Sequence, residues 1–254
     1  MNASHATDTA AMIIINADDW GRTAAETDAA LRCHAQGRIT SVTAMMFMHD
    51  SQRAAALALA HGVDTGLHLN FSQPFTAIDA ASPAAQAQQR VCRFINANKY
   101  AFILYNPALR RDFITSYRAQ AAEFERLYGR PPTHVDGHHH KHLCGNVLLG
   151  DVIPAGARVR RSFFFWPDEK GRVNRGYRHI TDRLLARKYR LTDYFFALSQ
   201  CLQGDRLARV LQLARSNTVE VMTHPADHRE EALLMSDGYL AQIAPLRRGT
   251  YSLL

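Results

Sequence analysis

The chain has 254 residues, of which 47% are hydrophobic, and a formal net charge of +7 at pH 7. A chain of this size can bury one large core, and a single α/β barrel would have about this length. It contains no run of about 18 apolar residues, so no transmembrane helix is expected. Residues 1–8 do not form a basic segment followed by an apolar one, so no signal peptide is predicted.

The four cysteines, Cys33, Cys92, Cys144 and Cys201, are isolated from one another in the sequence. None of them has C-x-x-C spacing, so they indicate neither a disulfide framework nor a structural zinc site. A reducing, cytoplasmic location is therefore favoured.

The positive charge is concentrated between Arg158 and Arg190, where eleven lysines and arginines accompany three acidic residues. This segment indicates an anionic partner, such as a phosphate-bearing substrate, a lipid headgroup surface or nucleic acid. The alternative is a solvated face without a partner.

The first part of the chain alternates predicted strands and helices. Three short apolar runs predict strands at residues 12–17, 39–47 and 65–69. One helix opens at a capping box formed by Thr23 and Glu26, and a second, alanine-rich helix covers residues 51–61. This alternation is typical of parallel strands joined by helical crossovers.

The remainder of the chain is less regular. Residues 70–105 are predicted to be a long, functional loop carrying one or two helices, and Asn106-Pro107 opens the longest helix, which ends near Tyr128. Further strands are predicted at residues 133–136, 157–165 and 218–223, and a further helix at 207–215. One domain over residues 1–254 is expected, with residues 1–11 as a disordered tail.

Residues 134–142 place five histidines and Asp136 within nine positions. A core does not need this density of imidazole, because each buried ring must find hydrogen-bond partners. Imidazole and carboxylate groups are together the preferred ligands of a catalytic divalent metal. This segment therefore predicts part of a metal site.

Other residues of ligand type follow the predicted strands at the point where each strand ends. They are Asp18, Asp19, His68, His138 and His224. In an α/β barrel, the carboxyl ends of the strands form the active site. We therefore expect these side chains to meet, although they lie far apart in the sequence.

A catalytic metal centre needs about three protein ligands and an open position for water. Asp19, His68 and His138 would supply one carboxylate and two imidazoles. Asp18 would then be free to act as a general base toward the water, and His224 could protonate the leaving amine. From outside the ligand set, Asp136 could orient a metal-bound imidazole.

Each of these residues also has a simpler interpretation. The Asp18-Asp19 pair can be a helix cap, and His68 can be a core histidine with satisfied hydrogen bonds. Residues 138–142 can form a chelating tract on the surface, and His224 can be a turn residue before proline. Their coincidence at four separate strand ends favours a shared functional site.

Four motifs, spread through the chain, resemble those of the YdjC family, which includes chitooligosaccharide deacetylases and hopanoid-biosynthesis deacetylases. They are N-A-D-D-W-G, G-L-H-L, H-V-D-G-H-H-H-K-H and M-T-H-P, at residues 16–21, 66–69, 134–142 and 222–225. An I-T-S-x-T strand at residues 39–43 also matches. The family usually has Phe where Trp20 stands.

The resemblance implies a distorted TIM-like (β/α) barrel and metal-dependent removal of an N-acetyl group from an amino sugar. It implies the same roles for the two aspartates and three histidines as those given above. Arg160 or Arg161 falls where relatives place an arginine after a strand, and Arg160 is expected beside the site. The two imidazole ligands favour zinc, and magnesium, the other candidate, would prefer more oxygen ligands.

The primary hypothesis is thus an N-deacetylase acting on an N-acetylated carbohydrate or glycoconjugate. His140 is expected near the substrate, and the aromatic side chains of Trp20, Phe71 and residues 163–166 could stack on pyranose faces. A rival hypothesis keeps the metal but hydrolyses another anionic sugar or amide. In a third, the basic segment binds nucleic acid or a membrane. An anionic membrane surface and a homodimer are further possible partners, whereas nucleic acid is not expected.

Overall fold

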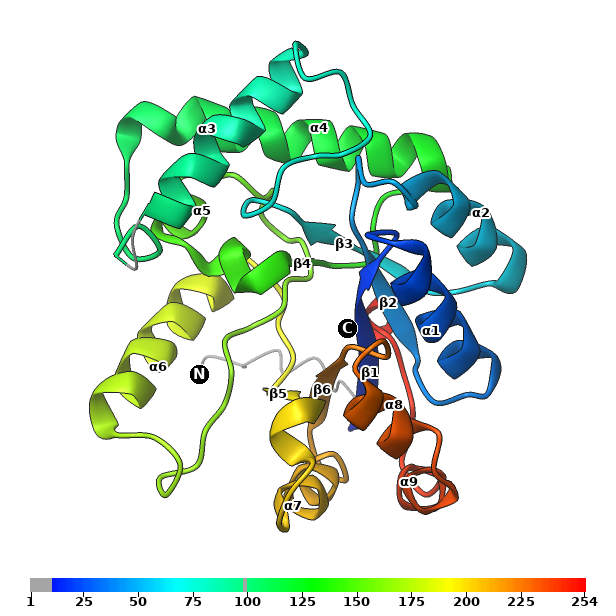
Figure 1. Ribbon diagram of the computed structural model, residues 1–254. Helices are drawn as coiled ribbons and strands as arrows, with labels where there is room; N and C mark the ends of the chain where they lie inside the picture. Colours follow the sequence, from blue (N-terminus) through cyan, green and yellow to red (C-terminus); the bar gives the residue numbers. More distant parts are fainter. Residues whose placement is uncertain (1–10, 98–99) are drawn as a thin grey trace, which may run out of the picture.

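The computed structural model describes residues 11–97 and 100–254. Its centre is a parallel sheet in the order β4-β3-β2-β1-β6-β5 (Figure 1). The strands are β1 (Met12–Trp20), β2 (Ser41–Ala44), β3 (Thr65–Leu69), β4 (Val135–Gly137), β5 (Tyr194–Ala197) and β6 (Thr218–Thr223). The sheet curls into a half-barrel, so the predicted α/β fold, a distorted TIM-like barrel in one domain, is confirmed. The predicted disordered tail, apart from Ala11, lies outside the described residues.

Helices flank the curled sheet (Figure 1). The α-helices are α1 (Ala24–Ala35), α2 (Ser51–His61), α3 (Pro83–Ala97), α4 (Arg110–Tyr128), α5 (Gly145–Leu149), α6 (Arg172–Ala186), α7 (Arg206–Leu213), α8 (His228–Leu234) and α9 (Asp237–Ile243). Short 3-10 helices cover Pro107–Leu109, His138–Leu143, Leu198–Cys201 and Tyr251–Leu253. Helix α3 lies in the segment at residues 70–105 predicted as a long loop carrying one or two helices, and α6 lies in the basic segment that the sequence pattern does not assign.

Strand β1 is the axis of the sheet, because all nine of its residues are buried and it pairs with both β2 and β6. Its register places Ala17 opposite Thr223, so β6 ends beside the point where Asp18 and Asp19 follow in β1. In the same way, His68 on β3 lies opposite Asp136 on β4. The parallel register thus brings the polar strand ends to one edge of the sheet.

The gap between the edge strands β4 and β5 is bridged by residues 157–164. The Arg160 N–H donates to Val135 O of β4 at 3.0 Å, and the Phe164 N–H donates to Phe195 O of β5 at 3.0 Å. The prediction of a continuous strand at residues 157–165 is wrong. The segment crosses from one edge strand to the other, so it forms only isolated bridges, such as Val135 with Val159.

The predicted capping box at the start of α1 is also wrong. Thr23 makes no side-chain hydrogen bond to a helical N–H. Its hydroxyl instead donates to Glu26 at 3.1 Å, while Arg22 Nε donates to the same carboxylate oxygen. The Glu26 side chain is therefore engaged by Arg22 and does not reach back to the backbone.

Two expectations about the whole chain can be compared with the structure. All four cysteines are free, as predicted. Among the helices in residues 11–97 and 100–254, none combines the length and the apolar character that crossing a bilayer requires.

We predict that Gly66→Ala lowers the free energy of unfolding by about 1–3 kcal/mol, because it overpacks the core next to His68. An added Cβ would lie 2.4 Å from the His134 ring, which is buried and stacked on Tyr251 at a centroid distance of 3.9 Å. Urea denaturation measures the change. Gly176→Ala is the control: its Cβ would meet no atom within 4 Å, and alanine favours the helix by about 0.5–1 kcal/mol. Equal effects of the two substitutions would contradict the prediction.

Candidate active site

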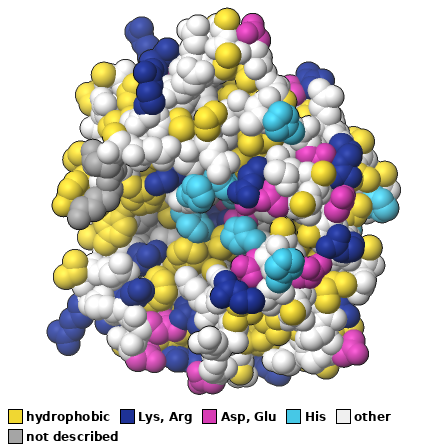
Figure 2. Space-filling model, in the orientation of Figure 1, with side chains coloured by type: hydrophobic (Ala, Val, Ile, Leu, Met, Phe, Trp, Pro, Cys, Tyr) yellow, Lys and Arg dark blue, Asp and Glu magenta, His cyan; other side chains and the backbone are white. Residues whose placement is uncertain are grey.

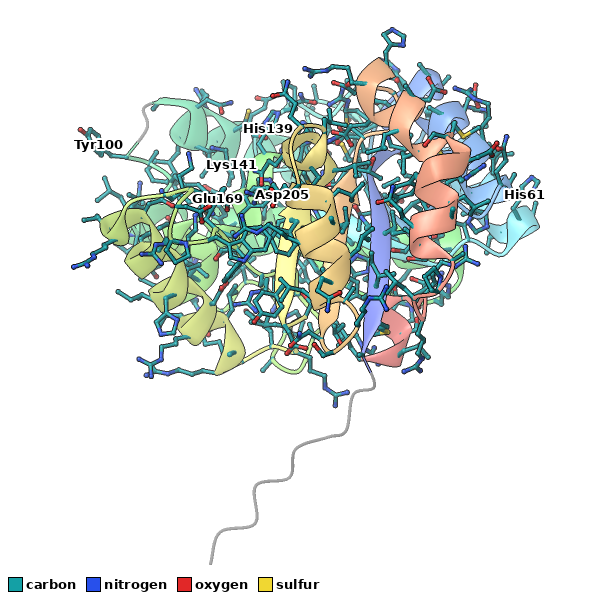
Figure 3. The ribbon with its side chains drawn as sticks, turned by 90° about the horizontal axis from the view of Figure 1, so that it is seen from below. His61, Tyr100, His139, Lys141, Glu169 and Asp205 are labelled. Atoms are coloured by element: carbon teal, nitrogen blue, oxygen red, sulfur yellow. The ribbon has the colours of Figure 1, made fainter. Side chains whose placement is uncertain are left out.

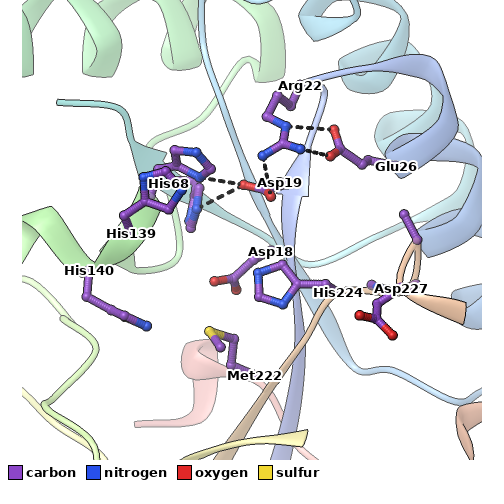
Figure 4. Close-up of a pocket in the computed structure, with 13 residues that line it drawn as sticks. Asp18, Asp19, Arg22, Glu26, His68, His139, His140, Met222, His224 and Asp227 are labelled. Carbon is purple, nitrogen blue, oxygen red and sulfur yellow. Dashed lines mark hydrogen bonds and ion pairs between the residues drawn. The ribbon is translucent and has the colours of Figure 1, made fainter. Parts of the chain in front are cut away.

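A pocket of about 470 Å³ opens at the carboxyl ends of β1, β3 and β6 and beside the turn that follows β4 (Figure 4). Most of the residues that line it are polar, and histidines come from three separate segments. Figure 2 shows these histidines gathered in a hollow at the centre of one face of the molecule. The strand ends therefore converge as the sequence predicts.

Asp19, His68 and His138 form a compact group at the pocket wall. Asp19 Oδ1 lies 2.8 Å from His138 Nδ1 and 3.3 Å from His68 Nε2. All three side chains are buried, and their ligand-type atoms lie within 4.8 Å of one another. Asp19 Oδ1 has no partner with hydrogen-bond geometry. A buried acceptor without a donor, facing two imidazole nitrogens, fits a bound cation.

Asp19 has a strained backbone, with φ at 65° at the end of β1. Residues with a Cβ rarely adopt this left-handed conformation, and they tend to do so at functional sites. The other oxygen of its carboxylate accepts a hydrogen bond from Arg22 at 3.0 Å. Arg22 thus fixes the carboxylate so that Oδ1 faces the histidines.

His68 is oriented from behind by Asp136, whose Oδ1 lies 2.7 Å from His68 Nδ1. This contact leaves Nε2 directed toward Asp19. Burial by itself lowers the pKa of His68, but the nearby carboxylates of Asp136 and Asp18 raise that pKa to about 10. A cation bound at Nε2 would have to displace a proton from the ring.

Arg160 lies behind the pocket, fully buried and surrounded by three carboxylates. Its two terminal nitrogens donate to the two oxygens of Asp18, each at 2.7 Å. The guanidinium also contacts Asp136 at 2.6 Å and donates from Nε to Glu220 at 2.8 Å. Asp18 is therefore not the free carboxylate that the sequence suggests, because Arg160 holds it in a bidentate pair.

The four buried carboxyl groups around the site have different positive partners. Asp18, Asp136 and Glu220 contact Arg160, whereas Asp19 pairs with Arg22 and faces His68, whose protonated form the nearby carboxylates favour. Burial raises the pKa of Glu220 to about 7, whereas contacts with His138 and His68 hold the pKa of Asp19 well below its ordinary value despite burial. A divalent cation beside Asp19 would take over the positive charge that a proton on His68 otherwise supplies.

The turn after β4 directs two imidazoles into the pocket. His139 and His140 have φ angles of 52° and 55°, so two consecutive residues adopt the left-handed conformation. His139 Nδ1 lies 3.1 Å from the Ser72 hydroxyl. Nδ1 of His140 is buried without a partner, and burial holds the pKa of this ring well below its ordinary value. Neutral His140 thus offers an unused polar atom to a ligand.

His224 lies across the pocket from the other histidines (Figure 4). Its Nδ1 is 3.8 Å from the buried Glu230 carboxylate, which accepts hydrogen bonds from the Thr223 hydroxyl and the His224 N–H. Burial opposes protonation of His224, but Glu230, Asp18 and Asp19 raise its pKa above the ordinary value. The ring is thereby suited to carry a proton.

The other histidines of residues 134–142 do not join the site. His134 stacks on Tyr251, and His142 Nε2 lies 3.0 Å from Arg160 O. Both rings are buried, so the segment is not a chelating tract on the surface.

The expectation that Trp20 and Phe71 contact a sugar is wrong, because both side chains are fully buried. The Trp20 indole donates to Ala54 O at 3.1 Å, and Phe71 packs on Phe113. Of the aromatic residues at 163–166, Phe163 contacts the His140 ring at a centroid distance of 4.5 Å.

Sequence reasoning did not identify Glu220, Glu230 or Arg22 as parts of the site. Glu220 was detectable, since it is the one charged residue of a buried strand. A carboxylate at the centre of a buried strand requires a positive partner. Glu230 and Arg22 carry no such signal, because charged residues in helices and turns are usually solvated.

Comparison with known proteins identifies the relatives of the chain. The family model described as YdjC-like protein matches residues 12–249. The chain belongs to the YdjC-like family. This YdjC-like protein is 29% identical over 238 residues to a chitooligosaccharide deacetylase of Yersinia enterocolitica, covering 90% of this chain and 86% of the relative.

Two further relatives have similar names. A chitooligosaccharide deacetylase of Serratia marcescens is 31% identical, with 85% of this chain and 81% of the relative covered. A carbohydrate deacetylase of Mus musculus is 28% identical, with 84% and 77% covered. Among solved structures, a candidate cellobiose-phosphate cleavage protein of Enterococcus faecalis superposes with a TM-score of 0.65, over 94% of this chain and 97% of that one. At 18% identity, that likeness supports the fold alone.

We predict that Arg160→Met lowers the free energy of unfolding by about 3–5 kcal/mol, because it leaves buried carboxylates without their counter-charge. Thermal or urea denaturation measures the change. Arg126→Met is the matched control, since Arg126 forms an exposed pair with Glu123 on α4, which should contribute less than about 1 kcal/mol. A loss from Arg160→Met no larger than that of the control would contradict the central role of Arg160.

Proposed function

We propose that this YdjC-like protein is a metal-dependent hydrolase that removes an N-acetyl group from an amino sugar or a sugar-containing conjugate. The observation that carries the proposal is the group of Asp19, His68 and His138 beside Asp18 in an open pocket. The names of the relatives, which are carbohydrate and chitooligosaccharide deacetylases, support the same reaction.

Asp19, His68 and His138 are the residues that would hold one divalent cation. The Asp19 oxygen without a hydrogen-bonding partner, which faces two imidazole nitrogens, fits such an ion. Two imidazoles and one carboxylate favour zinc over magnesium, which prefers oxygen ligands. When bound, the ion would lower the pKa of a water molecule and polarise the acetyl carbonyl.

Asp18 is proposed to accept the proton from the attacking water. Arg160 fixes both oxygens of the carboxylate at 2.7 Å, so the carboxylate keeps one orientation at the pocket wall. Oδ1 also accepts hydrogen bonds from Asn16 and Thr43, whereas Oδ2 accepts only from Arg160 and so retains a lone pair for the incoming proton.

His224 is proposed to deliver a proton to the leaving amine from the opposite wall. The Glu230 carboxylate favours the imidazolium form and orients the ring. The unpartnered Nδ1 of His140 would bind a polar group of the sugar. Base, acid and binding group thus surround one space from different sides.

A second candidate function is hydrolysis of an anionic sugar at the same centre. A pocket of about 430 Å³ is lined by Phe163 and by Arg161, Arg175 and Arg178, together with the carboxylates of Asp182 and Asp193. Phe163 also touches His140, which lines the first pocket. Assays that follow phosphate and acetate release in parallel distinguish this candidate from deacetylation.

We predict that Asp18→Asn and His138→Ala each lower the rate of acetate release from N-acetylglucosamine oligomers by about 100- to 10,000-fold, as expected for loss of a base or of a metal ligand. His138→Ala should also reduce the zinc retained after dialysis, measured by elemental analysis. His61→Ala is the control, because that exposed residue lies at the end of α2, far from the pocket (Figure 3). Full activity in both site variants would exclude the assignment.

We predict that Glu230→Gln moves the basic limb of the pH–rate profile to lower pH. An acid catalyst loses activity as the pH rises through its pKa, and the Glu230 carboxylate raises the pKa of His224. Glutamine keeps an oxygen for Thr223 and the His224 N–H, so the fold should persist. Glu231→Gln, which alters only a surface pair with Arg32, should leave the limb in place. An unshifted limb in Glu230→Gln would argue against His224 as the acid.

A further inference from the structure

A group of apolar side chains remains exposed at one end of the molecule. We call it the α5–α6 patch, and it consists of Ile103, Leu104, Leu149, Val173, Tyr177 and Ile180. Val173 is 89% exposed and Ile180 is 61% exposed. Ile103, Leu104 and Leu149 are each more than half exposed. Fully exposed side chains of this size are unfavourable in water when they lie together.

The patch is continuous across three segments of the chain. Ile103, Leu149, Tyr177 and Ile180 line one shallow groove of about 150 Å³. None of the described residues that line this groove is charged. In Figure 2, apolar side chains gather to the left of the histidine hollow, where α5 and α6 lie in Figure 1. Figure 3 places Tyr100, which precedes the patch, at the end of the molecule opposite His61.

Helix α6 has the pattern of a helix that lies on an interface. Val173, Tyr177 and Ile180 follow one another at spacings of four and three residues, so they share one stripe. Arg172 and Arg183 are exposed beside this stripe, and Arg187 follows at the C-cap of the helix. An apolar stripe bordered by arginines is typical of helices buried in the headgroup region of a bilayer.

The arginines beside the stripe have no carboxylate partner among the described residues. The four acidic residues between 151 and 190 are all engaged elsewhere: Asp151 with Lys188, Asp168 with Arg209, Glu169 with Arg206 and Asp182 with Arg161. The positive charge around the α5–α6 patch is therefore not neutralised within the protein. It complements a negative surface.

We propose that the α5–α6 patch docks on the surface of an anionic lipid bilayer. The apolar stripe would enter the headgroup region, and Arg172, Arg183 and Arg187 would contact lipid phosphates. A second copy of the chain fits less well. A two-fold interface would bring the same arginines of both copies together. The proposal does not depend on the reaction at the pocket.

The test is sedimentation of the full chain with vesicles of phosphatidylcholine alone or of equal parts phosphatidylcholine and phosphatidylglycerol. We expect binding to the anionic vesicles only, weakened by added salt. The double variant Val173→Asp/Ile180→Asp should bind at least ten-fold more weakly, and Arg183→Gln about five-fold more weakly. Leu59→Asp, on an equally exposed position of α2, should bind as the unaltered chain does. Circular dichroism checks that each variant is folded.

Three results would overturn the proposal. The unaltered chain could fail to prefer the anionic vesicles, or the double variant could bind as strongly as Leu59→Asp. The third result would be a dimer of the unaltered chain and a monomer of the double variant in analytical ultracentrifugation, with equal vesicle binding by both. That last outcome would assign the α5–α6 patch to contacts between copies of the chain.

Discussion

The Arg160 guanidinium lies fully buried between Asp18 of β1, Asp136 of β4 and Glu220 of β6. An ion removed from water in this way is tolerated only when opposite charges and hydrogen bonds surround it. Its partners come from strands on both halves of the sheet, and its own segment bridges the gap between β4 and β5. The same contacts therefore hold the curled sheet together and fix the carboxylates behind the pocket.

This arrangement separates the carboxylates into two groups with different surroundings. Asp18, Asp136 and Glu220 face Arg160, whereas Asp19 faces His68 and His138. Arg160 orients the first group, whereas Arg22 holds one oxygen of Asp19 and leaves Oδ1 without a hydrogen-bond donor. The same pocket thus contains an oriented carboxylate, Asp18, beside a group of side chains that could hold a metal ion, an arrangement suited to hydrolysis by an activated water.

The sequence was sufficient to predict the parts of the fold whose signals are local. The runs at residues 12–17, 65–69 and 218–223 are strands, and the polar residues that end them meet at one edge of the sheet. The role of Arg160 could not be derived from pattern, because its partner Asp18 lies 142 residues away. Residues 157–165 have the composition of a strand, but they cross from edge strand β4 to edge strand β5. That crossing depends on the curl of the whole sheet, which a local pattern does not reveal. Trp20 is of a residue type that often stacks on sugars, but its neighbours in space bury it, which the sequence does not reveal.

The two left-handed histidines, which directly follow the proposed ligand His138, would affect selectivity among ions at the proposed metal site. Each such residue is less stable than in an ordinary conformation by about 1–2 kcal/mol, so packing against β3 and β4 must maintain the turn that contains His139 and His140. A binding site that is rigid before the ion binds loses little conformational entropy on binding. It also adapts poorly to ions whose radius or coordination number differs. Discrimination between metals would then reside in the stiffness of this turn as much as in the chemistry of the donors.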